Sequence, residues 1–538
     1  MSNEQTAVCK LSEINDGEMK QVQMGETPVL LARVNGECFA LAAHCTHYGA
    51  PLAEGALVGD RIICPWHHAC FHVTNGDMIE PPALDSLPSF PVRIEGDDIF
   101  VDLPADPPDR REPTMAEPYA KADDRIFVII GGGAAGYAAA QTLREDGFKG
   151  RIVMITAEDR LPYDRPNLSK DYLHGHADPE WMPLRPEDFY GSHSIEVMRG
   201  RKVAAVEKGK KEIKLESGEI IEFDGLLIAT GGVPRTLSVP GADLKNILAL
   251  RSFESADTII AAADKATNVA IIGASFIGME AAFSLKTRGN NVTVIAPDKV
   301  PFERTFGTEI GEMFRELHEA NGVQFRLGAG VKGFEGNGSV NRVLLESGDP
   351  VDADLVIVGV GVRPATDFLK GFESHKDGGV IADRNLSIDS DIYAAGDIVH
   401  FWDSRAGKYS RIEHWRIALQ HGRVAAHNMA GKKTAFTEVP FFWTTQFDAT
   451  LNYVGHAEGW DEIIVDGKIA EKDFLAFYVK DGLVTAVAGM NHDKELAYFE
   501  ELMRLYGGQS VKQLKERLTN FSRADRETRG LSQSGKIS

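Results

Sequence analysis

The chain has 538 residues, with 58 Lys plus Arg against 79 Asp plus Glu and a formal net charge of −21. At roughly 150 residues per domain, this length predicts three to four domains, and the acidic balance argues against nucleic acid or an anionic membrane as a partner. No apolar run approaches the ~20 residues of a membrane helix. The start carries no export or organelle signal, so we expect a cytoplasmic protein without a membrane span.

The five cysteines all lie within the first 70 residues, at Cys9, Cys38, Cys45, Cys64 and Cys70. An odd number in a large chain without an export signal argues against a disulfide framework. We interpret Cys9 and Cys38 as packed structural thiols, and Cys70 as a packed thiol whose role stays open. Cys45 and Cys64 then need another explanation.

In chain order, the first expected unit is an all-β domain over residues 1–103. Its β-branched and aromatic runs, PVLLARV, ECFALAA, RIICPWH and DDIFVDL, are separated by Asn-Gly and Gly-Asp turns. Residues 104–118 contain five prolines and predict a semi-rigid linker without helix or strand.

The pattern then changes to alternating strands and helices, and two Gly-rich turns follow the strands RIFVII and NVAII. This predicts two α/β Rossmann-like nucleotide-binding domains. From about residue 437 the chain becomes strand-rich again before a helical stretch, which predicts an α+β C-terminal domain. The expected boundaries are 119–245 with 366–435 for the first nucleotide domain, 246–365 for the second, 436–522 for the C-terminal domain and 523–538 for a polar tail.

A Cys/His pattern dominates the N-terminal unit. Cys45-Thr-His47 is followed after 16 residues by Cys64-Pro-Trp-His67. In a Rieske 2Fe–2S centre one iron takes two Cys and the other takes two His, and this spacing lets each loop give one ligand to each iron. A structural zinc site is the alternative, but zinc sites usually pair Cys as C-x₂₋₄-C. We therefore predict Cys45, His47, Cys64 and His67 as cluster ligands, and interpret His44, His68 and His72 as surface residues or neighbours of the ligands.

The first Gly-rich turn is predicted to bind a dinucleotide. Gly131-x-Gly133-x-x-Gly136 stands between an apolar strand and a helix, where the glycines let the backbone approach a pyrophosphate. Glu158 ends the next strand, where a carboxylate binds a ribose hydroxyl pair. Gly396 and Asp397 mark a further strand end. We assign FAD to this fold.

The second turn, Gly273-x-Ser275-x-x-Gly278-x-Glu280, is predicted to bind the nicotinamide dinucleotide. Asp298, after the closing strand, suits an adenosine ribose and favours NADH. Lys299 and Arg304 nearby suit a 2′-phosphate, so NADPH stays open.

Four segments carry a family resemblance: PYDRPNLSK (162–170), IIGASFIGMEAA, AAGD and FFWTTQF (441–447). They resemble oxygenase-coupled ferredoxin reductases and apoptosis-inducing-factor flavoproteins. With the N-terminal module, nearly the whole chain resembles the Rieske-containing, apoptosis-inducing-factor-like (type 3) subfamily. Dimers occur among such relatives, so a homodimer stays open.

The resemblance also implies site residues. Lys170 pairs with Glu280 beside the flavin ring, where the ammonium stabilises reduced flavin and orients the nicotinamide; we count Lys170, Glu280 and Trp443 as catalytic. Further implied cofactor contacts are Arg165, Arg251, Asp397, Glu413, His414, Trp415 and Trp443 for the flavin, and Gly361 with Asp298 for NAD.

The N-terminal module resembles the ferredoxin-type Rieske proteins of bacterial oxygenase systems. Respiratory Rieske proteins carry an extra Cys in each loop and a Ser and a Tyr that hydrogen-bond the cluster sulfurs. Here Ala50, Trp66, Ala69 and Phe71 stand at those positions. Fewer donors stabilise the reduced cluster less, so we expect a potential at the low end of the Rieske range, which a redox titration measures.

The distribution of the cysteines limits how electrons can leave the flavin. Disulfide reductases on this flavoprotein fold need a Cys pair beside the flavin, where this chain has Asn167, Leu168 and Ser169. We therefore predict an NAD(P)H-dependent FAD oxidoreductase that passes electrons to its own Rieske cluster and on to an external one-electron acceptor: an oxygenase, a cytochrome or a ferredoxin. Two alternatives are a reductase whose Rieske domain is a redox sensor or docking module, and a non-enzymatic signalling protein related to apoptosis.

Overall fold

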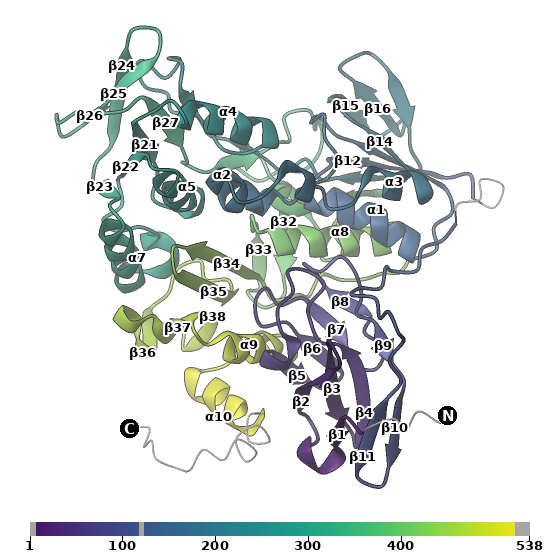
Figure 1. Ribbon diagram of the computed structural model, residues 1–538. Helices are drawn as coiled ribbons and strands as arrows, with labels where there is room; N and C mark the ends of the chain where they lie inside the picture. The colour runs from purple at the N-terminus through teal and green to yellow at the C-terminus, as the bar shows by residue number, and fades with distance from the viewer. Residues whose placement is uncertain (1–6, 118–122, 522–538) are drawn as a thin grey trace.

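The computed structural model describes residues 7–117 and 123–521. The predicted polar tail lies outside these residues. Figure 1 shows four regions, with the two α/β regions in the upper half of the view, the C-terminal region at the lower left and the N-terminal β region at the lower right. This arrangement confirms the fold class expected from the sequence.

The N-terminal region consists of three small sheets whose short strands follow the β-branched and aromatic runs. The strands are β1 (Cys9–Lys10), β2 (Met19–Met24), β3 (Thr27–Val34), β4 (Glu37–Ala42), β5 (Ala56–Val58), β6 (Arg61–Ile63), β7 (Cys70–His72), β8 (Met78–Glu80), β9 (Ser89–Phe90), β10 (Val92–Glu95) and β11 (Asp98–Val101). Their orders are β1-β11-β10, β2-β3-β4-β9 and β5-β6-β7-β8. The predicted ligand loops follow β4 and β6.

The proline-rich segment 104–117 forms neither a helix nor a named strand, and it is fastened to the surfaces on either side. Ser86 and Arg111 exchange backbone hydrogen bonds of 2.9 Å. Farther along, the Ala116 amide donates to the Arg144 carbonyl at 2.9 Å. The segment therefore runs along both neighbouring regions instead of spanning open solvent.

The first α/β region has a six-stranded sheet whose central strands are buried on both faces, as expected for parallel strands. Its order is β14 (Ile195–Met198), β13 (Arg151–Ile155), β12 (Ile126–Ile130), β18 (Gly225–Ile228), β31 (Ile392–Ala394) and β30 (Ser387–Asp389), parallel except for the edge strand β30. Helices α1 (Ala134–Glu145) and α8 (Trp415–Met429) lie side by side on one face. The smaller elements are α2 (Asp171–His174), α3 (Glu187–Ser192), β15 (Val203–Glu207), β16 (Glu212–Leu215), β17 (Ile220–Glu222), β29 (Val380–Ala382), β32 (Val399–Asp403) and β33 (Lys408–Ser410).

The second α/β region has a five-stranded parallel sheet. Its order is β20 (Ile247–Leu248), β27 (Leu355–Val358), β21 (Asn268–Ile272), β22 (Asn291–Ala296) and β23 (Gln324–Leu327). The remaining elements are α4 (Phe253–Ala263), α5 (Phe276–Thr287), α6 (Glu303–Phe306), α7 (Thr308–Ala320), β24 (Val331–Gly336), β25 (Val340–Leu345) and β26 (Val351–Asp352). An antiparallel pair, β19 (Gly232–Pro234) with β28 (Val362–Pro364), joins the two α/β regions.

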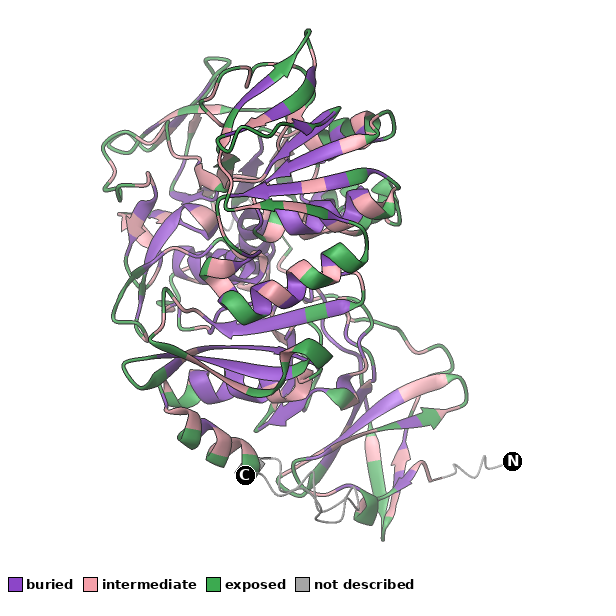
Figure 2. Cartoon of the chain, turned by 90° about the vertical axis from the view of Figure 1, so that its left-hand side faces the viewer, coloured by how far each residue is buried: buried purple, intermediate pink, exposed green. Residues whose placement is uncertain are grey.

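The C-terminal region is an antiparallel sheet with two helices. Its order is β34 (Phe441–Gln446), β35 (Ala449–Gly455), β38 (Leu483–Met490), β37 (Asp473–Lys480) and β36 (Glu462–Lys468), followed by α9 (Asp493–Tyr506) and α10 (Val511–Phe521). The edge strand β34 contacts α5 and α8, and α9 contacts β5 of the N-terminal region. Figure 2 shows buried residues running through the sheets of all regions, with exposed residues on the outer helix faces, the loops and some edge strands. None of the helices in the described ranges is both long and apolar enough to cross a bilayer.

Candidate functional site

The main cavity, of about 670 Å³, lies between the two α/β regions and β34. Among the residues predicted from the sequence, those that line it are Gly131, Gly133, Glu158, Arg165, Lys170, Arg251, Ser275, Glu280, Gly361, Gly396, Asp397, Glu413, His414, Trp415 and Trp443. Arg201 and Lys202 also line the cavity, and they lie outside the sequence motifs; Phe276 and Phe442 line it from two of the segments that carry the family resemblance.

The first Gly-rich turn provides a cradle at the start of α1. Gly131 has φ +119°, and a Cβ at Gly136 would lie 1.9 Å from the Gly131 carbonyl oxygen, so both positions require glycine. Gly136 thus packs the helix against the turn and does not line the cavity. Gly133 precedes the first helical residue and faces open space. A pyrophosphate fits against the free amides of this helix end.

Ion pairs hold the carboxylates of the first fold in place. Arg165 pairs with Glu158 at 2.7 Å, and Tyr163 donates to the same carboxylate at 2.6 Å. Arg165 also donates to the Arg251 carbonyl at 2.6 Å, and Arg251 pairs with Asp397 at 3.1 Å. Arg165 is the first residue of the short 3₁₀ segment Arg165–Ser169, and Lys170 directly follows this segment.

Glu280 is a buried charged residue in the cavity wall. It accepts hydrogen bonds from Lys170 Nζ at 2.8 Å, from Ser169 at 2.6 Å and from Thr444 at 2.9 Å. Its residue is 3 % exposed, and a buried carboxylate requires such compensation. The predicted pairing of Lys170 with Glu280 is present, and Thr444 adds a partner from β34 that the sequence did not identify.

His414 and Glu413 line the cavity just before α8. Burial lowers the pKa of His414 to about 3, so the imidazole is neutral, and its buried Nδ1 has no hydrogen-bond partner in the described chain. Burial also raises the pKa of Glu413, although Arg411 pairs with it. An orphaned buried nitrogen in a cavity of this size fits a polar ligand such as the FAD ring system.

The second Gly-rich turn repeats the backbone design of the first. A Cβ at Gly278 would lie 2.0 Å from the Gly273 carbonyl oxygen, so these two glycines pack the turn and stand behind the cavity wall. Ser275 precedes α5 and lines the cavity. Asp298 lies outside the cavity, beyond the end of β22, and is paired with Arg304 at 3.0 Å. Two of the residues weighed for opposite nucleotide preferences therefore bind each other.

The predicted cluster ligands converge at the tip of the N-terminal region. Cys45 and Cys64 are buried and their thiols interact directly, and the Nδ1 atoms of His47 and His67 lie 3.1 Å apart. Burial lowers the pKa of His47 to about 3, which leaves the imidazole neutral, the form that ligates metal. Two thiols and two facing Nδ1 atoms fit a Rieske 2Fe–2S cluster.

The two ligand loops have the same backbone design. The Cys45 amide bonds the Ala50 carbonyl and the Cys64 amide bonds the Ala69 carbonyl, both at 2.9 Å. In each loop the residue four positions after the Cys has positive φ, +78° at Gly49 and +56° at His68. Matched turns therefore present one sulfur and one imidazole each.

The cluster tip lies directly against the cavity wall. The His67 ring is 4.2 Å from the Trp443 ring, centroid to centroid, and the His47 ring is 6.5 Å from it. Tyr48 donates a hydrogen bond to Asp164, just before the segment that carries Lys170. One aromatic residue, Trp443, thus contacts a predicted cluster ligand and lines the cavity.

The flank of the N-terminal region is fixed by a buried ionic network that the sequence did not reveal. Arg416 binds Glu500 at 2.6 Å and the Pro81 carbonyl at 2.8 Å, and Glu500 also binds His68. Arg61 pairs with Glu501 at 3.1 Å. His68 is fully buried and stacks on Phe441 at 3.9 Å, so it is not a surface residue, and the interpretation as a neighbour of the ligands remains. The partners lie far apart in sequence, and no local motif marks them.

Comparisons with known proteins agree with this architecture. Residues 4–91 match the Rieske [2Fe-2S] domain, residues 126–422 the pyridine nucleotide-disulphide oxidoreductase model and residues 441–520 the reductase C-terminal model. The chain is 37% identical to "Apoptosis-inducing factor 3" from Homo sapiens over 93% of this chain and 84% of that protein.

Two further relatives match the reductase portion of the chain. The ferredoxin–NAD(+) reductase subunit of the benzene 1,2-dioxygenase system of Pseudomonas putida is 32% identical over 70% of this chain and 91% of its own. The covalent putidaredoxin reductase–putidaredoxin complex superimposes with a TM-score of 0.70 at 30% identity, over 76% of this chain and 99% of that one.

Proposed function

Because the chain belongs to the pyridine nucleotide-disulphide oxidoreductase family, we propose that it passes electrons from NADH to its own Rieske cluster and on to an external one-electron acceptor protein. It is a ferredoxin-reductase-like FAD oxidoreductase fused to a Rieske domain. When bound, FAD accepts a hydride and releases single electrons, and the 2Fe–2S cluster carries one electron at a time.

The observation that carries the proposal is the double contact of Trp443. Its ring lies 4.2 Å from His67 and lines the cavity assigned to FAD. Putidaredoxin reductase and putidaredoxin are two proteins that form a complex, whereas here a reductase region and a Rieske region share one chain and one interface. This supports transfer within the chain.

The residues around the cavity have separable roles in this proposal. The turn at Gly131–Gly136 and the Arg165–Glu158 pair bind and orient the dinucleotide. Lys170, held by Glu280, places a positive charge at the cavity wall, where it stabilises the added negative charge of the reduced ring. Ser275 and Gly361 line the cavity on the side of the second nucleotide-binding fold, and they bind the nicotinamide dinucleotide there.

The exit for electrons is the exposed aromatic edge beside the ligands. Tyr48 and Trp66 are 50% and 42% exposed, and their rings lie 5.7 Å and 6.5 Å from His67. We propose that the acceptor docks at this edge. The formal charge of −21 favours a partner with a basic or neutral face. The cytoplasm as compartment remains a prediction from the sequence, and the question of a homodimer stays open.

An anaerobic titration of the holoprotein with NADH tests the proposal. The EPR signal of a reduced Rieske cluster is expected to develop as NADH is added. If the flavin bleaches while the cluster stays oxidised, the transfer route is wrong and the alternative of a sensor or docking module is favoured. Absence of NADH turnover with artificial acceptors favours the non-enzymatic alternative.

NADH is the proposed donor over NADPH. Arg304, one of the two candidates for a 2′-phosphate, is paired with Asp298, and the dioxygenase relative is named for NAD(+). Steady-state rates with the two nucleotides at equal concentration decide this point; a higher kcat/KM for NADPH contradicts it.

A further inference from the structure

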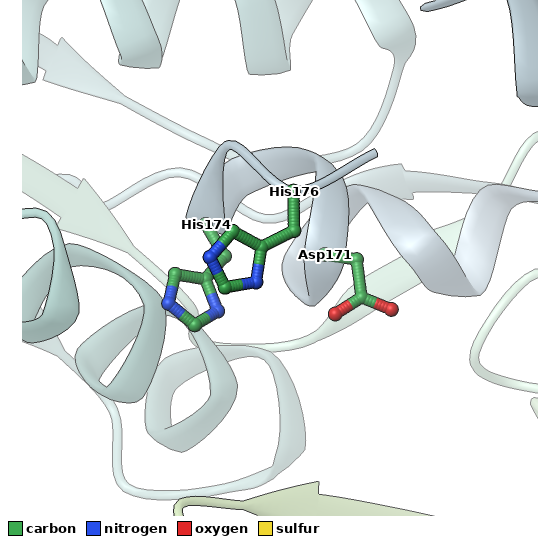
Figure 3. Close-up of side chains that lie close together, drawn as sticks. All are labelled: Asp171, His174 and His176. Carbon is green, nitrogen blue, oxygen red and sulfur yellow. The ribbon is translucent and has the colours of Figure 1, made fainter. Parts of the chain in front are cut away.

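A second group of metal-ligating side chains lies outside the cluster loops, at the end of α2. Asp171, His174 and His176 bring one carboxylate oxygen and two imidazole nitrogens within 4.8 Å of one another. Figure 3 shows the two imidazoles face to face, with the Asp171 carboxylate beside them. The ring centroids are 4.1 Å apart with an interplanar angle of 26°.

The backbone fixes this arrangement. The Asp171 carbonyl accepts hydrogen bonds from the amides of Gly175, His176 and Ala177, at 3.0, 2.8 and 3.1 Å. Gly175 has φ +92°, a left-handed conformation that ends the helix and turns His176 back over Asp171. The His174 ring is held edge-on against Phe283 at 5.1 Å.

The three ligand groups have no partner elsewhere in the described residues. The side chains of Asp171, His174 and His176 form no hydrogen bond or ion pair among those residues, and Nε2 of His174 is buried without one. Arg288, which lies beside this turn, is already paired with Asp264 and donates to the Leu173 carbonyl. A buried unpaired nitrogen costs free energy unless a ligand satisfies it.

A second group of the same composition makes the contrast clear. His375, Asp377 and His400 also approach within 4.8 Å, but Asp377 is bound by His400 at 2.9 Å and by the Arg411 guanidinium at 2.7 Å. Arg411 supplies the positive charge there, and the carboxylate lone pairs are already used. The same residue types thus have protein partners for their polar atoms around Asp377 and lack them around Asp171 within the described residues.

We propose that Asp171, His174 and His176 form a site for a divalent transition-metal ion of the Zn²⁺ or Cu²⁺ class. Two imidazole nitrogens and one carboxylate oxygen are the donors that these ions take, with a fourth position left to water or another ligand. Ca²⁺ and Mg²⁺ prefer oxygen donors and are not expected to bind. The site is independent of the proposed electron transfer, although Asp171 directly follows Lys170 in the chain.

Copper EPR on the fully oxidised holoprotein, without an affinity tag, tests the site. In that state neither the flavin nor the Rieske cluster is paramagnetic, so the signal of one added equivalent of Cu²⁺ is observed alone. We expect coupling to two nitrogens, and loss of this protein-bound signal when Zn²⁺ is added in large excess, because Cu²⁺ binds such donors more tightly than Zn²⁺ does at equal concentration. Absence of a protein-bound signal, or no effect of a large excess of Zn²⁺, overturns the proposal.

Variants locate the ion. His176→Ala and Asp171→Asn change exposed side chains. Each is expected to weaken Cu²⁺ binding by about tenfold or more, since even the loss of a residue that only hydrogen-bonds a metal ligand costs about 10- to 100-fold in affinity. His375→Ala, in the group around Asp377, is the matched control and is expected to bind as the unaltered protein does. Equal affinity in His176→Ala, or equal losses in all three variants, contradicts the assignment. Unchanged absorption of the Rieske cluster during the titration verifies that copper has not displaced iron.

Discussion

The N-terminal region touches the reductase in two very different ways. At its tip, half-buried rings meet: His67 lies against Trp443, with one hydrogen bond from Tyr48 to Asp164. On its flank, fully buried ions meet, with Arg416 and Glu500 at the centre. The tip contact is small and aromatic, as suits electron passage, whereas the flank contact carries the charges that hold the region in place. Docking and transfer are thus served by different residues and can be altered separately.

The largest expected effect comes from breaking the flank. Glu500→Gln leaves Arg416, which is 1% exposed, without its carboxylate. Removing one partner of a buried ion pair costs about 3–5 kcal/mol, so the docked arrangement is expected to loosen and cluster reduction to slow sharply. Denaturant unfolding and stopped-flow absorbance measure the two effects.

The matched control for that variant is Glu516→Gln on α10, a surface carboxylate paired with Lys512 at 3.8 Å. An exposed pair of this kind is worth about 0–1 kcal/mol. If the two variants behave alike, the flank does not hold the region in place.

The next effect concerns the cavity side of the tip. Lys170→Met removes the cation that Glu280 holds at 2.8 Å, and loss of one preorganised electrostatic group lowers kcat by about 10²-fold or more. Flavin reduction by NADH is the readout, and Lys170→Arg, which keeps the charge, is expected to recover part of the rate. Normal flavin reduction in Lys170→Met removes Lys170 from the chemistry.

A smaller effect is expected at the tip itself. Trp443→Ala deletes the ring between His67 and the cavity, and we expect cluster reduction to slow by about tenfold, equivalent to about 1.4 kcal/mol of activation free energy. Flavin reduction should change less than cluster reduction, and Trp443→Phe, which retains an aromatic ring, should fall between. Parallel changes in both steps would place Trp443 only in flavin binding.

A separate effect, on stability and not on a rate, is the pH dependence that the flank confers. Burial, with help from the Glu80 carboxylate, raises the pKa of Glu438 from 4.5 to about 7, while Arg416 and Arg61 oppose the shift. The folded state therefore holds a proton that the unfolded state releases between pH 4.5 and 7. This contribution to stability is complete below about pH 4.5 and is lost as the pH rises through 7.

Unfolding free energies at pH 5.5 and pH 8 test this sign. The contribution of Glu438 to the unfolding free energy should decrease as the pH rises. In Glu438→Gln the unfolding free energy should therefore change less between these two pH values. A Glu438→Gln profile parallel to that of the unaltered protein would falsify the assignment.

Local sequence patterns predicted the cofactors of this chain better than they predicted how its regions pack against one another. The cluster ligands and the glycines of both turns lie within short segments, and their spacing alone indicates what they bind. Asp298 was expected from its position after β22, yet the sequence did not reveal that Arg304 pairs with it. Gly136, Gly273 and Gly278 belong to the turns as packing residues, a distinction that needs the neighbouring backbone.

The ion pairs of the flank could not be predicted from the sequence. His68 and Glu500 are 432 residues apart, and Arg416 reaches Pro81 across 335 residues. His68 follows a ligand in a polar loop, which favours a surface position, but the fold places Glu500 of α9 against it. Long-range ion pairs depend on how separate regions dock, and no periodicity encodes that.

The central claim is that electrons reach the cluster from the flavin of the same chain. Stopped-flow mixing of the holoprotein with excess NADH, followed at flavin and cluster wavelengths over a wide range of protein concentration, tests it most directly. The account predicts that cluster reduction follows flavin reduction with a first-order rate that does not change with protein concentration. A rate proportional to protein concentration would mean that the cluster is reduced by another molecule's flavin, and would contradict it.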